Sequence, residues 1–261
     1  MKIASRNVNG LRAVIGKGFY DWIKNENPDI ICLQETKSFE HQLPPEFRFH
    51  MSDYNRIWHA GERPGYAGTA TFYKKSLKLI SSKSRFEDVE HFHADGRVVE
   101  TKFQNFVLLN LYFPNGGERA DGTEMLTYKL EFYEHFIHYI NKLKAAGEKI
   151  ITCGDFNICH KPIDIARPEE NKNSIGFLPI ERAEMDKLES NGYVDIFRHF
   201  HPELKDQYTW WSYRAGARPR NVGRRLDYFR VSENILPDIK KITHETAIEG
   251  SDHCPIVLEL H

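Results

Sequence analysis

The sequence predicts a single α/β or α+β domain, in which strands and helices are mixed along a chain of 261 residues. Short apolar, β-branched runs recur through the chain, and stretches with helical spacing lie between some of them. No internal repeat, low-complexity tract or long Pro/Gly/Ser linker interrupts the pattern. We therefore expect one domain over residues 1–261, long enough to bury a sizeable core.

Eight short runs rich in β-branched and aromatic residues are predicted as strands of a large sheet system. They span residues 2–5, 29–34, 69–74, 97–103, 106–113, 149–154, 225–231 and 255–260. Between them, three stretches have helical spacing. They lie around Phe19 to Ile23 before Pro28, from Tyr133 to Leu143 before Gly147, and after Pro179 as far as Asn191 and Gly192.

Composition restricts the classes of protein that the chain can represent. Lys plus Arg (36) nearly balance Asp plus Glu (37), which argues against binding nucleic acid by bulk charge. No run approaches twenty apolar residues and residues 1–10 lack a signal-peptide pattern, so we expect a soluble, cytoplasmic, prokaryotic protein with no membrane partner. The four cysteines form no CxxC pair, which fits a reducing compartment and not a zinc site.

Acids and amides occur repeatedly at strand ends. Asn7, Asn9, Glu35, Asp155 and Asn157 follow three of the predicted strands, and Asp252 and His253 directly precede the last one. If these side chains share a site, the last strand must run opposite to the other three, and the sheet must be mixed. Taken singly, each acid is more often a turn or helix-capping residue; the joint placement favours a site.

Carboxylate and amide oxygens without cysteine are hard ligands that suit Mg²⁺, with Mn²⁺ as the alternative. Glu35 is the first candidate ligand, with Asp252 and the amides of Asn7 and Asn9 near it. A cation would also explain how several carboxylates can lie close together.

The ring of His253 needs a carboxylate to orient it, and this carboxylate must come from another part of the chain. Neighbouring side chains in extended backbone point apart, so Asp252 is a poor partner for the ring of His253. Asp227, in RRLDYF, is the best candidate. An isolated Ser-Asp-His is otherwise more often a turn.

A basic and aromatic stretch, residues 208–228, is predicted to form a local anion-binding face. The alternative is a solvated loop with Trp210 or Trp211 buried. Weaker candidates for nucleic-acid contact are Arg12, Tyr66 in a glycine-rich loop, and residues 171–174.

Seven motifs together resemble the exonuclease III family of apurinic/apyrimidinic endonucleases. They are NVNGLRA (7–13), LQETK (33–37), LYFPNG (111–116), GDFNI (154–158), WWSYRAGAR (210–218), RRLDYF (224–229) and SDHCP (251–255). The resemblance runs in order along nearly the whole chain, and the combination is specific although each piece alone is not.

The resemblance implies a DNase I-like fold, a four-layer α/β sandwich of two packed mixed β-sheets flanked by helices. It implies Mg²⁺-dependent hydrolysis of the phosphodiester 5′ to abasic sites in double-stranded DNA, with 3′-end repair and 3′-to-5′ exonuclease activity, by an expected monomer. The substrates would be duplexes with abasic sites or blocked 3′ ends. An alternative is a 3′-end processing exonuclease with weak abasic-site incision.

The resemblance also implies a role for each matching residue. Glu35 would be the principal metal ligand, with Asn7, Asn9 and Asp252 around it. Asp155 would activate water, Tyr112 and Asn157 would hold the scissile phosphate, and His253, paired with Asp227, would bind phosphate or move a proton. Which of Asp155 and His253 takes the proton stays open. The expected DNA contacts are Arg12, Tyr66, Asn115, Asn173, Trp210, Arg214, Asn221, Arg224 and Leu226.

Three positions depart from the family pattern. Arg6 and Arg224 stand where aromatic residues are typical, and Asn9 stands where some members have Asp. A small apolar pocket near Trp210 and Leu226 is expected to admit the baseless sugar. Our hypothesis is that Arg224 weakens apolar packing there, adds a phosphate contact and shifts the balance among the activities.

Other functions are weaker alternatives. The fold also serves phosphomonoesterases and lipid phosphodiesterases, so it cannot name the substrate. A binuclear metallophosphatase would need Asp-x-His and Gly-Asn-His motifs, which the sequence lacks. A catalytically silent DNA-binding module is disfavoured because all the candidate acids and His253 are present.

Overall fold

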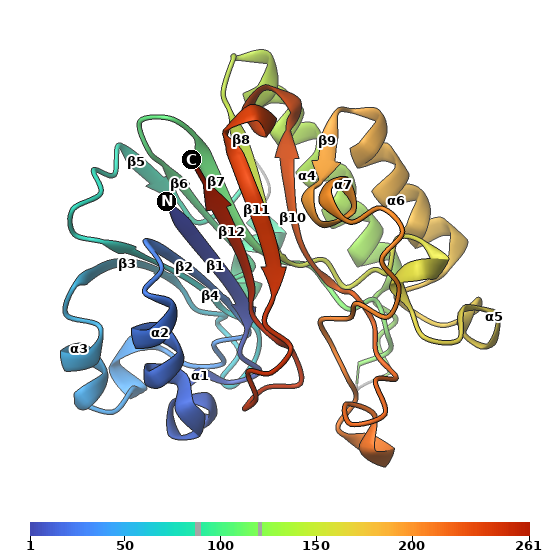
Figure 1. Cartoon of the computed structure of the whole chain (residues 1–261), viewed down its shortest axis with the longest axis horizontal. Helices are drawn as coiled ribbons and strands as arrows, with labels where there is room; N and C mark the ends of the chain where they lie inside the picture. Colours follow the sequence, from blue (N-terminus) through green and yellow to red (C-terminus); the bar gives the residue numbers. More distant parts are fainter. Residues whose placement is uncertain (87–89, 120–121) are drawn as a thin grey trace.

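The computed structural model describes residues 1–86, 90–119 and 122–261 as two packed β-sheets with helices on their outer faces (Figure 1). The first sheet has six strands, in the order β11 (Ile239–His244), β12 (Ile256–Leu260), β1 (Lys2–Asn7), β2 (Ile30–Gln34), β4 (Thr69–Lys74) and β3 (Tyr54–His59). The second sheet also has six, in the order β5 (Ser81–Lys83), β6 (Val98–Lys102), β7 (Val107–Tyr112), β8 (Ile150–Asp155), β10 (Asp227–Ser232) and β9 (Tyr193–Asp195). The expected four-layer sandwich is confirmed.

Both sheets are mixed. In the first sheet β1 pairs parallel with β2 and antiparallel with β12. In the second, β8 pairs parallel with β7 and antiparallel with β10. The last strand therefore runs opposite to the first, as predicted. The expectation that all four strand ends lie in one sheet is wrong, because β8 belongs to the second sheet and its end meets the others across the interface between sheets.

Helices cover the outer faces in two groups. Helices α1 (Leu11–Val14), α2 (Tyr20–Glu26) and α3 (Glu46–His50) lie beside the first sheet, and α4 (Leu126–Ala145) and α6 (Pro179–Ser190) beside the second. Two short helices, α5 (Pro168–Asn171) and α7 (Ile196–Phe200), complete the set. The three predicted helical stretches correspond to α2, α4 and α6. Among the described residues, none of the helices is long and apolar enough to cross a membrane.

Side chains alternate along a strand, so the two faces of one strand contribute to different apolar clusters. Ile31 and Leu33 face α1 to α3, whereas Ile30 and Cys32 face the second sheet. Because the inner strands are covered on both faces, they appear in the sequence as continuous apolar runs. All four cysteines are buried and free.

The predicted strands are the eight inner ones, and the four that the sequence did not reveal are the sheet edges β3, β5, β9 and β11. Strand β5 is exposed throughout, and β11 buries only Ile239 and Ile242. An edge strand is covered on fewer sides, so its sequence lacks the apolar run that marks an inner strand.

Candidate active site

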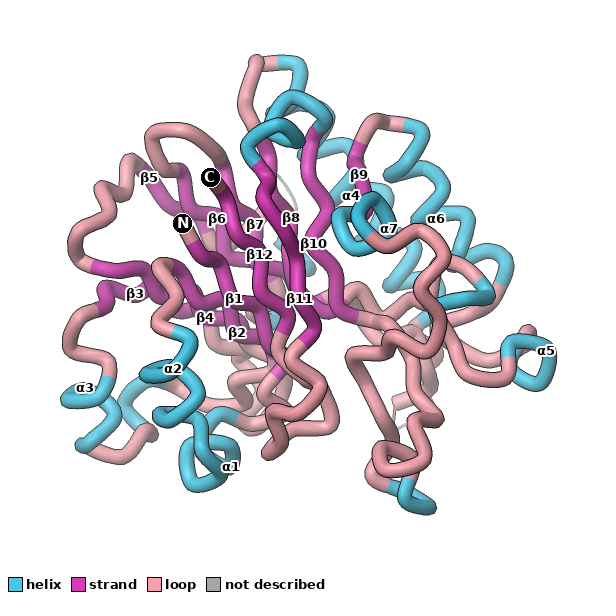
Figure 2. Tube along the Cα trace, viewed as in Figure 1, coloured by secondary structure: helices cyan, strands magenta, loops and turns pink. Residues whose placement is uncertain are grey.

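The inward-facing side chains of five inner strands change from apolar to polar toward one end of the sandwich. The series are Ile3, Ser5 and Asn7; Ile30, Cys32 and Gln34; Leu108, Asn110 and Tyr112; Ile151, Cys153 and Asp155; and, in the reverse direction, Asp227, Phe229 and Val231. Loops gather at this polar end, at the lower edge of the view in Figure 2. The alternation of strand side chains thus brings the predicted residues together from both sheets.

Asp155 is the centre of this group. The Asn7 amide nitrogen donates to Asp155 Oδ2 at 2.9 Å and to Glu35 Oε1 at 2.9 Å, and so joins the two sheets. The backbone N–H of Asn157 donates to Asp155 Oδ1 at 2.9 Å, and the His253 Nε2 atom lies 3.8 Å from Asp155 Oδ2. Burial raises the pKa of Asp155 to about 7; the His253 charge opposes this shift, and Asp227 and Glu35 add to it.

Three site residues have left-handed backbone conformations. The φ angles of Asn9, Glu35 and Asn157 are 45°, 50° and 53°. This region is unfavourable for residues with a Cβ atom, and such strain is found where surrounding contacts hold a functional side chain. Glu35 directly follows β2 and Asn157 lies two residues after β8, so these conformations occur where the two strands end.

Oxygens from Glu35 and Asn9 converge on one positive charge. The Lys37 ammonium lies 2.7 Å from Glu35 Oε2 and donates to Asn9 Oδ1. Asn9 in turn donates to Asp252 Oδ1 at 2.9 Å. Oxygen donors that already surround a cationic group are suited to a hard cation. Sequence analysis did not identify Lys37, although its place in LQETK was visible.

Asn7 has a different arrangement from the expected ligand. Its amide oxygen accepts a hydrogen bond from the backbone N–H of Asn9 at 2.9 Å, and its nitrogen faces the two carboxylates. In this arrangement Asn7 acts as a bridge between Glu35 and Asp155, and the oxygens that converge belong to Glu35 and Asn9.

His253 contacts Asp227, which the sequence offered as its best candidate partner. The ring nitrogen Nδ1 lies 2.8 Å from Asp227 Oδ2, and both residues are buried. Burial favours the neutral ring, but the charges of Asp227, Asp155 and Asp252 outweigh it and raise the pKa of His253 to about 10. At neutral pH the ring is therefore a cation, with Nε2–H directed toward Asp155.

Tyr112 presents a protonated hydroxyl beside these groups. Its side chain is 8% exposed, and burial, with a contribution from Glu35, raises its pKa well above the usual value. The Arg97 guanidinium lies 4.9 Å from the Tyr112 ring and donates to the Tyr66 hydroxyl at 2.7 Å. Arg97 thus connects Tyr66, an expected DNA contact, to Tyr112; its buried position could not be inferred from the sequence.

Trp210 connects the expected apolar pocket with the carboxylates. Its Nε1–H donates to Asp252 Oδ2 at 3.0 Å, and its ring packs on the cluster of Cys159, Ile165, Phe177 and Leu226. Trp211 is the buried tryptophan of the pair. A cavity of about 360 Å³ is lined by Asp252, together with Lys17, Tyr213 and Arg218 among others.

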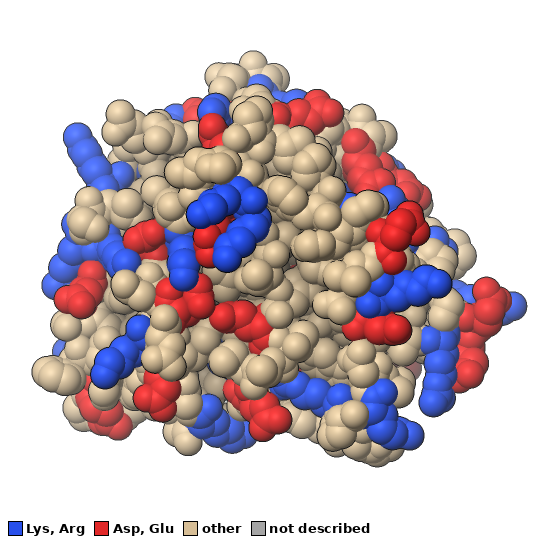
Figure 3. Space-filling view, in the orientation of Figure 1, with Lys and Arg blue, Asp and Glu red and all other residues tan. Residues whose placement is uncertain are grey.

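The expected anion-binding face of five arginines is only partly present. Arg225 is fully buried, 2.8 Å from Asp164 and 2.7 Å from Asp195, two carboxylates that lie outside the stretch. Arg218 donates to the carbonyl oxygens of residues 246, 248 and 251. Arg214 and Arg220 are exposed. Charges of both signs are interspersed over the face in Figure 3, as the near-zero net charge predicts.

Arg224 is held against the 171–176 loop. It donates to Ile175 O at 2.8 Å and to Asn171 Oδ1 at 3.2 Å, and its guanidinium lies 5.8 Å from the Trp210 ring. Two of its nitrogens thus donate to that loop, and its contact with phosphate stays a prediction.

The remaining predicted DNA contacts are found in three different environments. Asn115 donates to Asn157 Oδ1 at 3.2 Å and so belongs to the site. Asn221 is engaged with the Trp211 indole and with Asp206 O. Arg12 and Asn173 are exposed, on α1 and in the 171–178 loop.

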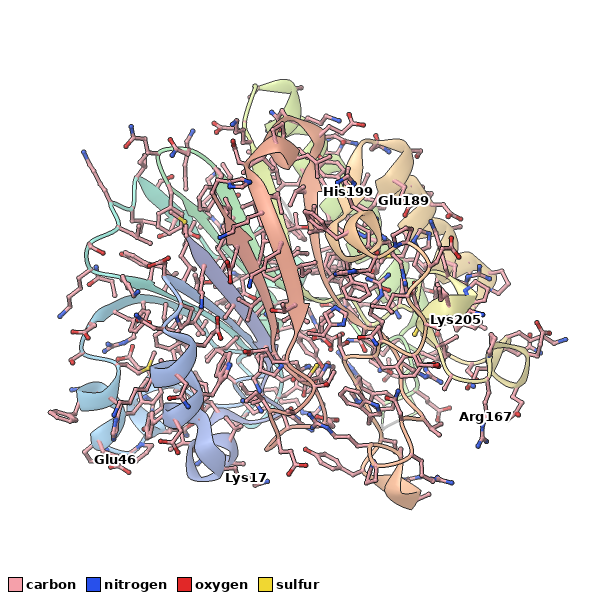
Figure 4. The ribbon with its side chains drawn as sticks, viewed as in Figure 1. Lys17, Glu46, Arg167, Glu189, His199 and Lys205 are labelled. Carbon is pink, nitrogen blue, oxygen red and sulfur yellow. The ribbon has the colours of Figure 1, made fainter. Side chains whose placement is uncertain are left out.

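A second group of possible ligands lies away from this site. Ligand atoms of His160, Asp186 and Glu189 lie within 4.8 Å of one another, on the outer side of α6, where Figure 4 labels Glu189. Arg230 lies 3.1 Å from His160 Nδ1, and Lys161 lies 3.2 Å from Glu189. These cations already neutralise the group, so it is a poor candidate for a metal.

The comparisons with known proteins all identify the same family and its nucleases. Residues 7–253 match the model of the endonuclease/exonuclease/phosphatase family. The chain is 41% identical to an exodeoxyribonuclease of Bacillus subtilis, over 99% of the chain and 98% of that protein. It is 38% identical to a DNA-(apurinic or apyrimidinic site) endonuclease of Dictyostelium discoideum, over 98% and 69%. The solved structure of an AP endonuclease from Archaeoglobus fulgidus superposes with a TM-score of 0.87 at 29% identity, covering 100% and 99% of the two chains.

The His253–Asp227 contact leads to a titration prediction. In Asp227→Asn the pKa of His253 should fall by about 1 to 3 units, because the facing charge is removed while burial remains. Proton NMR titration of the ring measures it, and Asp186→Asn, which removes one partner of His160, is the control.

The folding stability of the protein should depend on the protonation of His253. The folded pKa of about 10 exceeds the unfolded value of about 6.5, so the contribution of the charged ring is complete below about 6.5 and is lost as pH rises toward about 10. An unchanged His253 pKa in Asp227→Asn would contradict this account.

Proposed function

The chain belongs to the endonuclease/exonuclease/phosphatase family, within the exodeoxyribonucleases and apurinic/apyrimidinic endonucleases of DNA repair, and we propose that it hydrolyses the phosphodiester 5′ to abasic sites in duplex DNA. A 3′-phosphodiesterase/3′-phosphatase and a 3′-to-5′ exonuclease activity at the same site are part of the proposal. The observation that carries it is the convergence on Asp155 of Asn7, Asn157 and His253, with Glu35 on the same amide of Asn7.

Mg²⁺ is the proposed cation, with Mn²⁺ as the alternative, and the donor set fits it. The ligand oxygens are those of Glu35, with Asn9 and Asp252 beside it, and the amide of Asn7 orients the Glu35 carboxylate. When bound, the cation would neutralise phosphate charge and stabilise the leaving oxygen. Lys37 would then give up its contact with Glu35 and stay near the phosphate.

Asp155 is the proposed general base. With a pKa of about 7 it can accept a proton from water near neutral pH, whereas His253, with a pKa of about 10, already carries its proton. The water oxygen forms the new bond to phosphorus, and the bond to the 3′ oxygen breaks. The products are a 3′ hydroxyl and a 5′ phosphate on the abasic sugar.

Neutral and cationic donors around Asp155 suit the developing negative charge. Tyr112 Oη–H, the Asn157 amide and His253 Nε2–H are assigned to the phosphate oxygens, and Asp227 holds the His253 ring in place. Asn115, which contacts Asn157, is assigned to the same phosphate. The Asn157 amide nitrogen donates to Phe113 O at 2.8 Å and to Asp155 Oδ2 at 3.3 Å, and it would exchange the longer contact for a phosphate oxygen.

Recognition of the damaged strand is assigned to the Trp210 and Leu226 cluster beside Asp252. An apolar surface next to the carboxylates suits a flipped sugar without a base. Arg12, Tyr66, Asn173, Arg214, Asn221 and Arg224 are assigned to the DNA on either side. Residues 1–261 are proposed to form one domain, since both halves of the chain contribute to the core between the sheets. A monomer is proposed as well.

The proposal is tested with a 5′-labelled duplex that contains one abasic-site analogue. Wild-type protein should incise it with Mg²⁺ and not with EDTA, and Glu35→Ala should lower kcat by about 10²-fold or more, because transition-state charge is no longer stabilised. Glu46→Ala, an exposed acid on α3 (Figure 4), is the matched control and should cut normally. Incision that survives EDTA, or is unchanged in Glu35→Ala, would overturn the assignment.

Arg224 favours a second candidate, a 3′-end processing exonuclease with weak abasic-site incision, as the name of the Bacillus relative suggests. Arg224→Trp should raise abasic-site incision relative to 3′-to-5′ degradation by about tenfold, because an indole packs better than a guanidinium against a baseless sugar. Both rates are measured on the same duplex, with and without the abasic analogue. An unchanged ratio would show that Arg224 does not set the balance.

A further inference from the structure

A fully buried ion pair lies directly behind the phosphate-binding side of the site. Lys129 of α4 and Glu181 of α6 are both 0% exposed, and Nζ lies 2.6 Å from Oε1. Neither residue touches the carboxylate group around Asp155, and neither is needed for the chemistry proposed above.

The ammonium of Lys129 holds two active-site loops. It donates to Asn115 O at 3.0 Å, to Asn157 O at 2.8 Å and to Glu181 at 2.6 Å, which uses all three of its N–H groups. The loops that it joins carry the two asparagines assigned to the scissile phosphate. Their side chains also contact each other, from Asn115 Nδ2 to Asn157 Oδ1 at 3.2 Å.

The carboxylate of Glu181 holds a third loop. Its Oε2 atom accepts the backbone N–H of Gly176 at 2.7 Å and of Leu178 at 3.0 Å. This is the 171–178 loop, which also receives the guanidinium of Arg224. One ion pair therefore fixes three loops that come from distant parts of the chain.

The packing around the pair leaves little freedom. Gly116 has φ of +85°, and a Cβ atom added there would lie 2.8 Å from Lys129 Cδ, so the loop lies directly on the lysine stem. Asn157 has φ of 53°, a conformation that costs free energy, and its carbonyl is fixed by Lys129. The contacts specify backbone positions that the loop sequences alone would not hold.

Stability alone is a poor explanation for such a pair. Removing two charges from water costs roughly what their attraction returns, and well-packed apolar residues often stabilise a protein as much. The pair also fixes the orientation of the loop backbones, because each of its donors and acceptors has a defined partner.

We propose that Lys129 and Glu181 are positioning residues for the phosphate-binding loops, holding Asn115 and Asn157 in the geometry that the reaction needs. The proposal rests on the proposed function, since it concerns the same phosphate. It assigns no contact between either residue and the DNA.

Three variants test the pair. Lys129→Met keeps the length of the stem but removes the donors and leaves a buried carboxylate unpaired, so its Tm should fall strongly. Lys129→Met/Glu181→Gln removes both charges, keeps an acceptor for Gly176 and Leu178, and should recover most of the lost Tm. Tyr139→Phe is the control: it lies on the same helix and removes a donor to buried Glu100, away from the site.

The expected result separates position from stability. The double variant should regain stability while kcat on the abasic duplex stays at least about tenfold below wild type and KM changes less than about threefold. Tyr139→Phe should lower Tm and leave kcat unchanged. Wild-type kcat in the double variant, or in folded Lys129→Met, would overturn the proposal.

A second readout does not require activity. The side-chain amide NMR signals of Asn115 and Asn157 should shift or broaden in the double variant and stay in place in Tyr139→Phe. If wild-type protein cuts no DNA, the proposed function fails while these spectra still decide whether the pair positions the loops. Unmoved amide signals in the double variant would overturn the positioning role.

Discussion

The packing of the two sheets is the constraint on which the rest of the structure depends. The interior between them is apolar at one end and polar at the other, and a small amide network marks the change. Gln34 of the first sheet donates to Asn110 Oδ1 of the second at 2.7 Å, and Asn110 donates back to Leu33 O and Ala70 O. Buried amides need defined partners, so this network fixes how the sheets lie on each other. Glu35 and Tyr112, one and two residues further along their strands, are thereby set at a fixed separation.

The inner part of the fold could be predicted from the sequence, and the outer part could not. Strands covered on both faces carry continuous apolar runs, which is why residues 106–113 and 149–154 were evident. Edge strands such as β5 and β11 are exposed and carry lysines, so nothing distinguishes them from loops. The short helices α3, α5 and α7, of four or five residues, are too brief to show a periodicity. The assignment of β8 to a second sheet depends on pairing between distant segments, which no local pattern contains.

The site was predictable where it depends on alternation along a strand or on motifs. Side chains at i and i+1 diverge, which argued against Asp252 as the partner of His253, and the candidate chosen elsewhere in the chain, Asp227, makes the contact. Charged residues whose partners lie far away in sequence were misjudged or missed. Arg225 was counted as surface charge, yet Asp164 and Asp195 enclose it. Lys129 gave no signal, and it precedes the helical stretch predicted from Tyr133 onward. The position of a residue along a strand predicts the face on which its side chain lies. It does not predict which distant charged residue the side chain contacts.

We propose that Glu35 of the first sheet and Asp155 of the second serve one transition state, although they come from separate sheets. A kinetic double-mutant cycle tests it most directly, with Glu35→Gln, Asp155→Asn and the combination assayed for kcat on the same abasic duplex. Residues that act as a unit are strongly non-additive, so the double variant should be about as slow as the slower single variant. A double variant whose loss equals the product of the two single losses would contradict the claim, because the two sheets would then contribute independently.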